Sequence, residues 1–293
     1  MNPSKATLLV PVELQVRELD AKLLLACIAA RRGFPSVIGP RREMHFHIPS
    51  FPKSIYLSKS LTSGSISVFR MMSRLGHKRV AWDEEALVHL PPESYYQRRL
   101  SAVSIQFVNY LLAWGKDNEE LWRKYPKMPS GIPIRITGNP RGDLLRPEMR
   151  GLYDHDVKKI CRAHGDFILI NTNFNQVNAY YPDMNLLKPA SGPGEEPELS
   201  RRAIGMGMNR EYAEGLTRHK QAIFGDFQRL IPVLDQALPD HKIVIRPHPA
   251  ENQEVYHRIA KQCRRVQVTN EGNVVPWLIA AKALIHNGCT TGV

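Results

Sequence analysis

Short apolar runs alternate with amphipathic segments along the chain, and the alternation occurs twice in 293 residues. Apolar runs bounded by Gly, Pro or charged residues are typical of buried parallel strands, and apolar positions every three or four residues are typical of helices. In the first half this predicts strands over 6–14, 35–40, 53–57, 78–85 and 110–115, with a strand and turn over 132–145. Helices are predicted over 17–33, 65–76, 93–102 and 116–126.

The second half repeats the alternation. It predicts helices over 154–165, 209–238, 253–265 and 274–281, and strands over 166–174, 241–249, 266–269 and 282–288, with a polar loop over 175–205. Two rounds of strand and helix predict an α/β fold with two doubly wound, Rossmann-like domains facing a cleft. The turn "TGNPRGDLL" is the natural hinge, so the expected domains are 1–148 and 149–293.

Composition indicates a globular protein, with 43% hydrophobic and 23% charged residues. The longest apolar run, 23–30, is too short to cross a bilayer, and the N-terminus has no features of a signal peptide. The cysteines (Cys27, Cys161, Cys263 and Cys289) are far apart and lack metal-ligand spacing. We therefore expect reduced thiols and a cytoplasmic protein.

The formal net charge of +12 favours an anionic partner. The excess comes as scattered Arg doublets, with no long basic run and no basic segment interleaved with aromatic residues. Phosphorylated substrates or an anionic membrane surface would explain the charge as well as DNA or RNA would, and a solvated basic face would explain any single doublet. We expect no nucleic-acid partner and contact with an anionic membrane face.

Ligands of doubly wound sheets bind beyond the carboxyl ends of strands, and "RPHPAE" at 246–251 lies at such an end. Pro247 and Pro249 restrict the backbone around His248, and a rigid His beside Arg246 suits a phosphate, with Glu251 close by. A turn whose prolines end the strand, with His248 on the surface, is the alternative.

The segment "HNGCTTG" at 286–292 also follows an apolar strand. Its glycines permit a tight turn, Thr290 and Thr291 offer hydroxyl donors beside Asn287, and a following helix would present free N–H groups to an anion. A threonine pair is also an ordinary helix N-cap, which is the alternative.

"WDEEAL" at 82–87 places Asp83, Glu84 and Glu85 at the end of a strand in the first half. Crowded carboxylates raise one another's pKa, and a raised pKa suits a general base for a sugar hydroxyl. Acidic residues are equally common at helix N-termini, where they interact with the helix dipole.

"NTNFNQ" at 171–176 brings Asn171, Asn173 and Asn175 to another strand end. Their amides could bind a nucleotide or a sugar, or only cap and turn the backbone. The sequence contains no P-loop, no GxGxxG after a strand, no HExxH, no GxSxG and no metal-spaced histidine cluster, and His45 and His47 are interpreted as incidental. We expect neither a metal nor a cofactor.

At these four motifs the sequence resembles bacterial surface carbohydrate biosynthesis proteins of the GT-B glycosyltransferase type. It is most similar to the branch of CMP-sugar users, the sialyl- and Kdo-transferases. The parallels are an acidic motif in the N-terminal domain, a His-Pro motif, and a threonine-containing loop after the last core strand. One departure is Ala86, which stands where the acidic motif usually has Gly.

The resemblance implies transfer of a sugar from a nucleotide-sugar donor, CMP-linked, to a glycan or glycolipid acceptor in capsule or lipopolysaccharide assembly. His248 would contact the donor phosphate or nucleotide, Thr290 and Thr291 would bind the same phosphate, and Glu84 or Glu85 would act as base on the acceptor. The remaining predicted site residues are Asp83 for catalysis and Arg246, Glu251, Asn171, Asn173 and Asn287 for donor binding.

In the family the loop after the last core strand continues into a helix, and here the chain stops at Val293. This predicts a C-terminal domain truncated inside its donor site, without full activity. Two other functions remain open. A CDP-glycerol-type polyol-phosphotransferase has similar His-Pro motifs, and a non-catalytic glycan- or nucleic-acid-binding module would use the positive charge.

Overall fold

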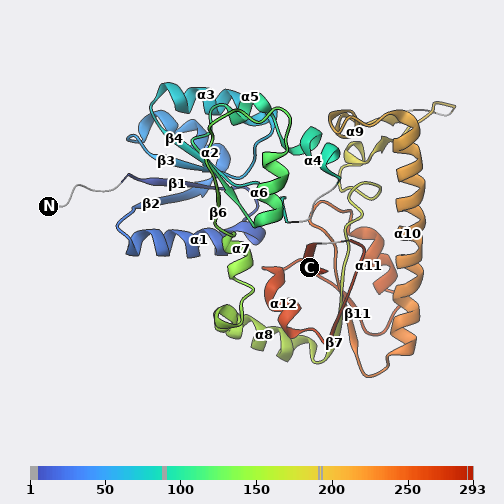
Figure 1. Ribbon diagram of the computed structural model, residues 1–293. Coiled ribbons are helices and arrows are strands. Elements are labelled where there is room, and N and C mark those ends of the chain that lie inside the picture. The colour runs from blue at the N-terminus through green and yellow to red at the C-terminus, as the bar shows by residue number, and fades with distance from the viewer. Residues whose placement is uncertain (1–5, 88–90, 191, 193, 289, 293) are drawn as a thin grey trace. The chain divides into compact units, whose positions relative to one another are not determined.

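The computed structural model describes residues 6–87, 91–190, 192, 194–288 and 290–292. The chain forms two compact units, Met1–Arg150 (unit 1) and Gly151–Val293 (unit 2), each with its own sheet and hydrophobic core (Figure 1). Cys289 and Val293, which belong to the predicted terminal loop, lie outside the described residues.

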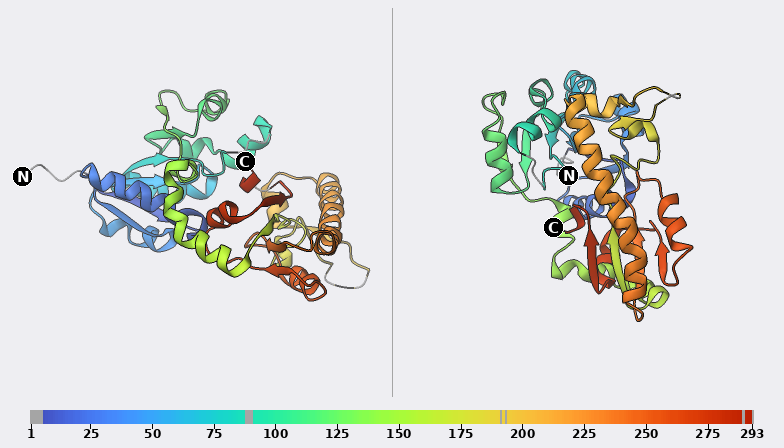
Figure 2. Two further views of the ribbon diagram at one scale, coloured as in Figure 1. Left: turned by 90° about the horizontal axis from the view of Figure 1, so that it is seen from below. Right: turned by 90° about the vertical axis from the view of Figure 1, so that its right-hand side faces the viewer.

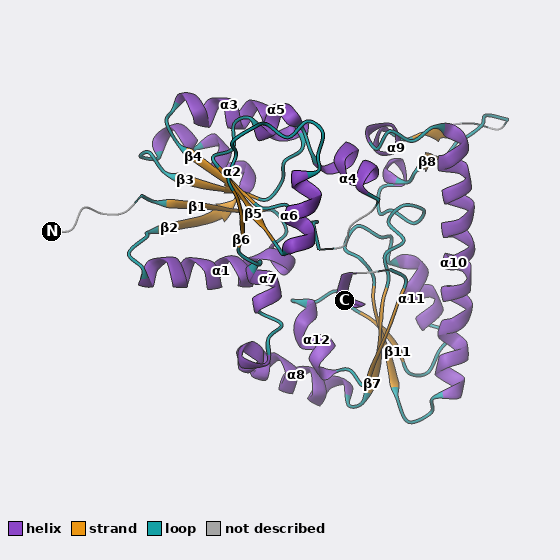
Figure 3. Cartoon of the chain, viewed as in Figure 1, coloured by secondary structure: helices purple, strands orange, loops and turns teal. Residues whose placement is uncertain are grey.

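Unit 1 contains a six-stranded sheet in which every neighbouring pair is parallel (Figure 3). Its strands are β1 (Leu8–Val12), β2 (Ser36–Pro40), β3 (Ile55–Ser58), β4 (Lys78–Ala81), β5 (Tyr110–Ala113) and β6 (Ile134–Ile136). The strand order is β2-β1-β3-β4-β5-β6. The chain winds to one side of β1 and then to the other, so the topological switch point lies between β1 and β3.

The helices of unit 1 cover both faces of this sheet. They are α1 (Gln15–Arg31), α2 (Arg41–Phe46), α3 (Ile66–Arg74), α4 (Pro92–Arg99), α5 (Ala102–Ile105), α6 (Lys116–Arg123) and α7 (Pro140–Asp143). Short 3-10 turns are η1 (Ile48–Ser50), η2 (Ser63–Ser65) and, across the unit boundary, η3 (Pro147–Tyr153). Strand alternation separates two cores: Leu9 packs with Phe69 and Trp122, whereas Val10 packs with Trp82 and with Leu25 of α1.

Unit 2 contains a four-stranded parallel sheet in the order β11-β10-β7-β12. Its strands are β7 (Phe167–Asn171), β10 (Lys242–Arg246), β11 (Val266–Val268) and β12 (Ala283–His286), and a short antiparallel pair is formed by β8 (Leu187–Lys188) and β9 (Glu198–Leu199). The chain runs from β7 through β10 to β11 and then crosses to β12 on the far side of β7. The switch point of unit 2 therefore lies between β7 and β12.

Helices also cover both faces of the sheet in unit 2. They are α8 (Asp154–His164), α9 (Arg201–Gly205), α10 (Arg210–Ala237), α11 (Glu254–Ala260) and α12 (Val274–Ala280), with 3-10 turns η4 (Pro182–Met184) and η5 (Thr290–Gly292). Helix α10 runs the length of the unit (Figure 2). Ile231 of α10 and Tyr256 of α11 pack on one face against Ile243, whereas Trp277 of α12 packs on the other face against Val244.

The prediction of two doubly wound, parallel α/β units is confirmed. The predicted strands and helices are present, with ends that differ from the prediction by a few residues. The structure also contains short elements that the hydrophobic pattern did not indicate. The loop predicted over 175–205 contains η4, the β8–β9 pair and α9. These elements are too short to show a hydrophobic period. Among the described residues no helix is long and apolar enough to cross a membrane.

Substitution of the largest buried side chain of unit 1 tests the assignment of its hydrophobic core. Trp122 is 0% exposed and its indole N–H donates to the Tyr95 hydroxyl at 2.9 Å. We expect Trp122→Ala to lower the free energy of unfolding of unit 1 by about 3–5 kcal/mol in a urea titration, because it leaves a cavity. Phe46→Ala, at a ring that is 67% exposed, should change it by less than about 0.5 kcal/mol. Equal effects would contradict the assigned core.

Candidate functional site

The strands β10, β7 and β12 end level with one another at the carboxyl edge of unit 2. Asn171, the last residue of β7, is in register with Arg246 of β10 and with His286 of β12. The loops that follow these strands therefore begin side by side. Three of the predicted motifs, "NTNF", "RPHP" and "HNGCTTG", lie in these loops, and the switch point between β7 and β12 is the expected ligand position of such a sheet.

Hydrogen bonds join the loops after β7 and β12. The Asn171 side-chain amide donates to the Thr291 hydroxyl at 2.9 Å, and the backbone N–H of Asn173 donates to Asn287 Oδ1 at 2.7 Å. The turn between them requires Gly288, which has a φ of 76°. Thr290 is exposed in η5. Residues 120 positions apart are thus brought together at the switch point.

Gly292 lies against the ring of His286. A Cβ at position 292 would stand 2.1 Å from His286 Nε2, a separation that real atoms do not allow. A side chain at position 292 would have to displace either the imidazole or the threonine turn.

His248 is held at the same edge by its backbone and by its ring. Its N–H donates to Thr172 O and to Glu251 Oε1, both at 3.1 Å, and its ring Nδ1 accepts from the Ala250 N–H at 3.1 Å. A nitrogen that accepts an N–H carries no proton, so the neutral ring bears its proton on Nε2. In this tautomer the ring N–H is at Nε2, and contact with an anion requires such an N–H donor.

Glu251 is enclosed by the protein, although the sequence predicts that it binds the donor. Its side chain is 0% exposed and accepts hydrogen bonds from the Thr172 hydroxyl at 3.1 Å and the Tyr256 hydroxyl at 2.6 Å, in addition to the His248 N–H. Burial raises the pKa of Glu251, and these hydrogen bonds oppose the rise. The carboxylate is enclosed by protein, so Glu251 positions the His248 turn.

Arg246 also differs from the expected phosphate contact. The side chain is 8% exposed, and its guanidinium donates to Glu271 O at 2.8 Å and to Gly272 O at 3.0 Å while it lies 4.8 Å from the centre of the Trp277 ring. Burial lowers its pKa to about 10. These contacts tie the turn after β11 to the end of β10, which is a structural role.

Arg202 of α9 also belongs to the site, although nothing in its sequence context beyond an Arg doublet indicated this. It donates to the Asn175 backbone carbonyl at 2.9 Å and to Asn175 Oδ1 at 2.8 Å. Asn175 in turn donates to Asn173 Oδ1 at 3.0 Å and lies 3.5 Å from His248 Nδ1. A continuous polar network thus runs from Arg202 through the "NTNF" loop to both His248 and Asn287.

Two buried amide atoms in this network have no hydrogen-bond partner. They are Asn171 Oδ1, on a side chain that is 3% exposed, and Asn287 Nδ2. A buried polar atom left unpaired costs about 1–3 kcal/mol, and a ligand or an ordered water that pairs with it removes this cost. Their presence at the switch point indicates a place where a ligand or water completes the structure.

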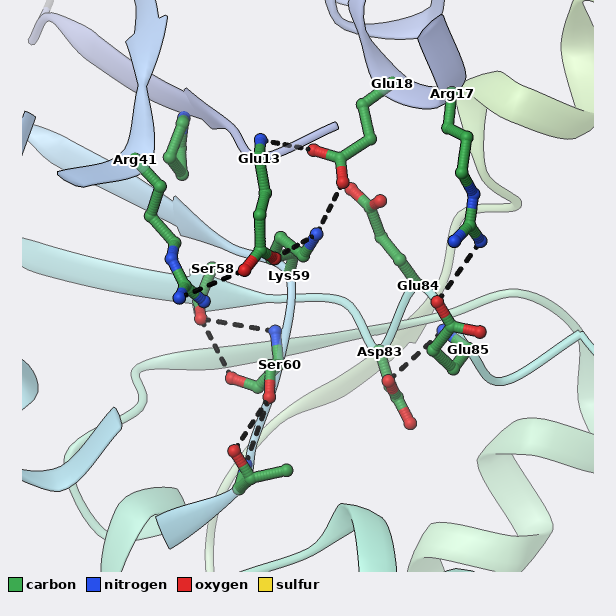
Figure 4. A network of polar contacts seen from close by, with 12 residues as sticks. Glu13, Arg17, Glu18, Arg41, Ser58, Lys59, Ser60, Asp83, Glu84 and Glu85 are labelled. Atoms are coloured by element: carbon green, nitrogen blue, oxygen red, sulfur yellow. Dashed lines mark hydrogen bonds and ion pairs between the residues drawn. The ribbon is translucent and has the colours of Figure 1, made fainter. Parts of the chain in front are cut away.

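In unit 1 the carboxylates of "WDEEAL" diverge instead of crowding (Figure 4). Asp83 is 0% exposed and pairs with Arg99 while accepting from the Tyr95 hydroxyl at 2.8 Å. Glu84 and Glu85 turn to two different cations, Lys22 and Arg17 respectively, each at 3.3 Å. The expectation that these three carboxylates crowd one another is therefore wrong, because they pair with three different cations.

The switch point of unit 1 is filled by a second group of charges that the sequence did not reveal (Figure 4). Glu18 of α1 accepts from Lys22 at 2.7 Å and from Lys59, which follows β3, at 2.5 Å. Lys59 also pairs with Glu13, which follows β1, at 2.6 Å, and Arg41 pairs with Glu13 at 3.1 Å. The cavity left beside Glu18 and Lys22 is about 10 Å³, room for about one water molecule.

A larger concavity of about 620 Å³ lies elsewhere in unit 2, along the edge strand β11. His164, His257, Lys261 and Trp277 contribute to its lining. It contains none of the predicted site residues. In the described part of the chain, no three His, Cys, Asp or Glu side chains group closely enough to hold a metal ion.

No family model matches the sequence, and no curated protein matches it. Among solved structures, the chain is similar to the crystal structure of Anabaena Alr3699/HepE in complex with UDP and glucose. The two share 11% sequence identity with a TM-score of 0.44, over 96% of this chain and 73% of that chain.

The charged group in unit 1 predicts a pH dependence of stability. Burial alone would raise the pKa of Glu18, but hydrogen bonds from Lys22 and Lys59 outweigh it and lower the pKa from 4.5 to about 2. The stabilisation is therefore complete above pH 4.5 and is lost as the pH falls toward about 2. We expect Glu18→Gln to be less stable than wild type in urea titrations at pH 6.

The stability difference between wild type and Glu18→Gln should shrink steadily as the pH is lowered from about 4.5 toward 2, because protonation removes the same charge that the substitution removes. Glu43→Gln, at an exposed residue of α2, is the matched control and should track wild type throughout. A difference that stays constant across this range would show that Glu18 does not carry the depressed pKa.

Proposed function

We propose that this protein is a glycosyltransferase that moves a sugar from a nucleotide-sugar donor, CMP-linked, to a surface glycan or glycolipid acceptor. The observation that carries the proposal is the switch point of unit 2. There, the loops after three level strand ends gather an imidazole, two threonine hydroxyls and several amides, two of whose buried atoms are unpartnered. Donor groups at the carboxyl edge of such a sheet suit the phosphate of a nucleotide.

The proposed leaving group is the nucleotide phosphate, held by hydrogen-bond donors. His248 is proposed to contribute its ring N–H, and the Thr291 hydroxyl, whose oxygen accepts from Asn171, is proposed to donate its proton to a phosphate oxygen. Thr290 adds a second hydroxyl from the exposed side of η5. Hydrogen-bond donors that are fixed before the reaction stabilise developing negative charge without reorganisation. These side chains are therefore proposed to stabilise the charge of the leaving phosphate in place of a metal.

The proposed acceptor side is unit 1. Asp83 and Glu84 are buried and paired with cations, whereas the Glu85 side chain is 48% exposed beside Arg17. Among the three predicted carboxylates, Glu85 is therefore the proposed general base, and Asp83 and Glu84 are proposed to position its turn. A base must reach the hydroxyl whose proton it takes, which a buried carboxylate cannot do.

The distribution of charge supports a proposed cytoplasmic position at the inner face of the membrane. Unit 1 contains 23 Lys and Arg against 13 Asp and Glu, a net charge of +10. Unit 2 contains 17 against 15, a net charge of +2. An acceptor attached to an anionic lipid surface would be attracted to unit 1, which carries nearly all of the excess positive charge.

Calorimetric titration with CMP tests the role of His248. We expect His248→Ala to weaken CMP binding by about tenfold or more, because a hydrogen bond to a charged phosphate is lost. His257→Ala, at an exposed histidine of α11 beside the β11 concavity, should bind CMP as wild type does. Unchanged affinity in His248→Ala would remove this residue from the mechanism.

Turnover assays with a CMP-sugar and with CDP-glycerol then distinguish sugar transfer from polyol-phosphate transfer. Consumption of CDP-glycerol alone would replace the proposed activity with the polyol-phosphotransferase alternative. Salt-sensitive binding of RNA or DNA, with no binding of any nucleotide-sugar, would instead indicate a non-catalytic module.

A further inference from the structure

The unpartnered atoms of Asn171 and Asn287 are the feature of the site that the phosphate does not explain. One polar atom of each side-chain amide is hydrogen-bonded and orients the group: Asn171 Nδ2 donates to the Thr291 hydroxyl, and Asn287 Oδ1 accepts from the Asn173 N–H. The remaining polar atoms, Asn171 Oδ1 and Asn287 Nδ2, are buried and unpaired. The network therefore fixes one acceptor and one donor in place without using either.

The two atoms belong to neighbouring strand ends. Asn171 is in register with His286, and Asn287 is the next residue after His286. The Asn171–Thr291 and Asn173–Asn287 hydrogen bonds hold the loops after β7 and β12 together, so both unpaired atoms belong to one pair of joined loops at the switch point.

The chemistry of the pair excludes a phosphate as the complete partner. Phosphate oxygens at neutral pH accept hydrogen bonds, so they can satisfy Asn287 Nδ2 but not Asn171 Oδ1, which needs a donor. A hydroxyl both donates and accepts. Two hydroxyls on adjacent carbons can thus donate to Asn171 and accept from Asn287 at the same time.

We infer that Asn171 and Asn287 bind the paired ribose hydroxyls of the nucleotide and so select a ribonucleotide over other phosphates. The inference rests on the proposed function, which places the nucleotide part of the donor in unit 2 and its phosphate at His248 and Thr291. The ribose is joined to that phosphate by one ester link. Thr291, which contacts Asn171 directly, brings the phosphate and ribose positions next to each other.

Calorimetry with matched ligands tests the inference. CMP, UMP, GMP and AMP are titrated into wild type, and the tightest binder is compared with its dideoxy analogue, which lacks both ribose hydroxyls, and with inorganic phosphate. Wild type should bind the ribonucleotide about tenfold or more tightly than the dideoxy analogue. Asn171→Ala and Asn287→Ala should each lose about tenfold in affinity for the ribonucleotide.

Asn287→Ala should keep its affinity for the dideoxy analogue and for inorganic phosphate within about twofold, which also shows that the site is folded. In Asn171→Ala, whose lost amide also holds Thr291, the loss of affinity for the ribonucleotide should exceed the loss for the dideoxy analogue and for inorganic phosphate by about tenfold. Asn270→Ala is the matched control, because the Asn270 Nδ2 is likewise buried and unpartnered but lies in the turn after β11. It should bind all three ligands as wild type does.

Three results would overturn the inference. Equal losses for the ribonucleotide and its dideoxy analogue would mean that the amides serve another group or only support the loops. Unchanged ribonucleotide affinity in both variants would mean that water satisfies the two atoms. If wild type binds none of the four nucleotides, the proposed function fails together with the inference, whereas binding without discrimination between ribose and dideoxyribose removes the inference alone.

Discussion

The parallel pairing of β7 with both β10 and β12 is the constraint on which the site in unit 2 depends. The register ends the three strands at the same level, and the chain reverses its winding direction at β7. The loops after these strands are tens of residues apart in the sequence, yet they start beside one another at the same edge of the sheet. Because backbone hydrogen bonds set the register of the strands, the side chains at the strand ends have fixed positions before any ligand is present.

Hydrogen bonds within the polar network show which of the predicted donor-binding residues the protein itself encloses. Glu251 and Arg246 have the residue types that phosphate chemistry suggests, yet both are buried and hydrogen-bonded to neighbouring protein groups. The proposed phosphate contacts are instead His248 and Thr291, in the loops after β10 and β12. Burial and hydrogen-bond accounting decide between these roles, and residue identity alone does not.

The hydrophobic pattern sufficed for the two sheets because buried parallel strands carry a strong local signal, as in "HKIVIRPHP". It also placed the polar motifs at strand ends. It could not show that Arg202 reaches Asn175, 27 residues earlier, or that Lys59 reaches Glu18, 41 residues earlier. Neither contact has a local period or motif. The pattern also could not predict that the side chains of Asp83, Glu84 and Glu85 diverge, because this depends on where α1 and α4 place their cations.

The ion network at the β1–β3 switch point has a consequence for how this sequence can change over time. Glu18 and Lys22 are almost entirely buried, and removing one member of a buried ion pair costs far more than replacing both by apolar side chains. Lys22 also pairs with buried Glu84, and Glu18 also pairs with Lys59, so replacing Glu18 and Lys22 together would leave Glu84 without its cation. Single and double replacements are therefore disfavoured, and relatives should keep this charged group or replace it as a whole.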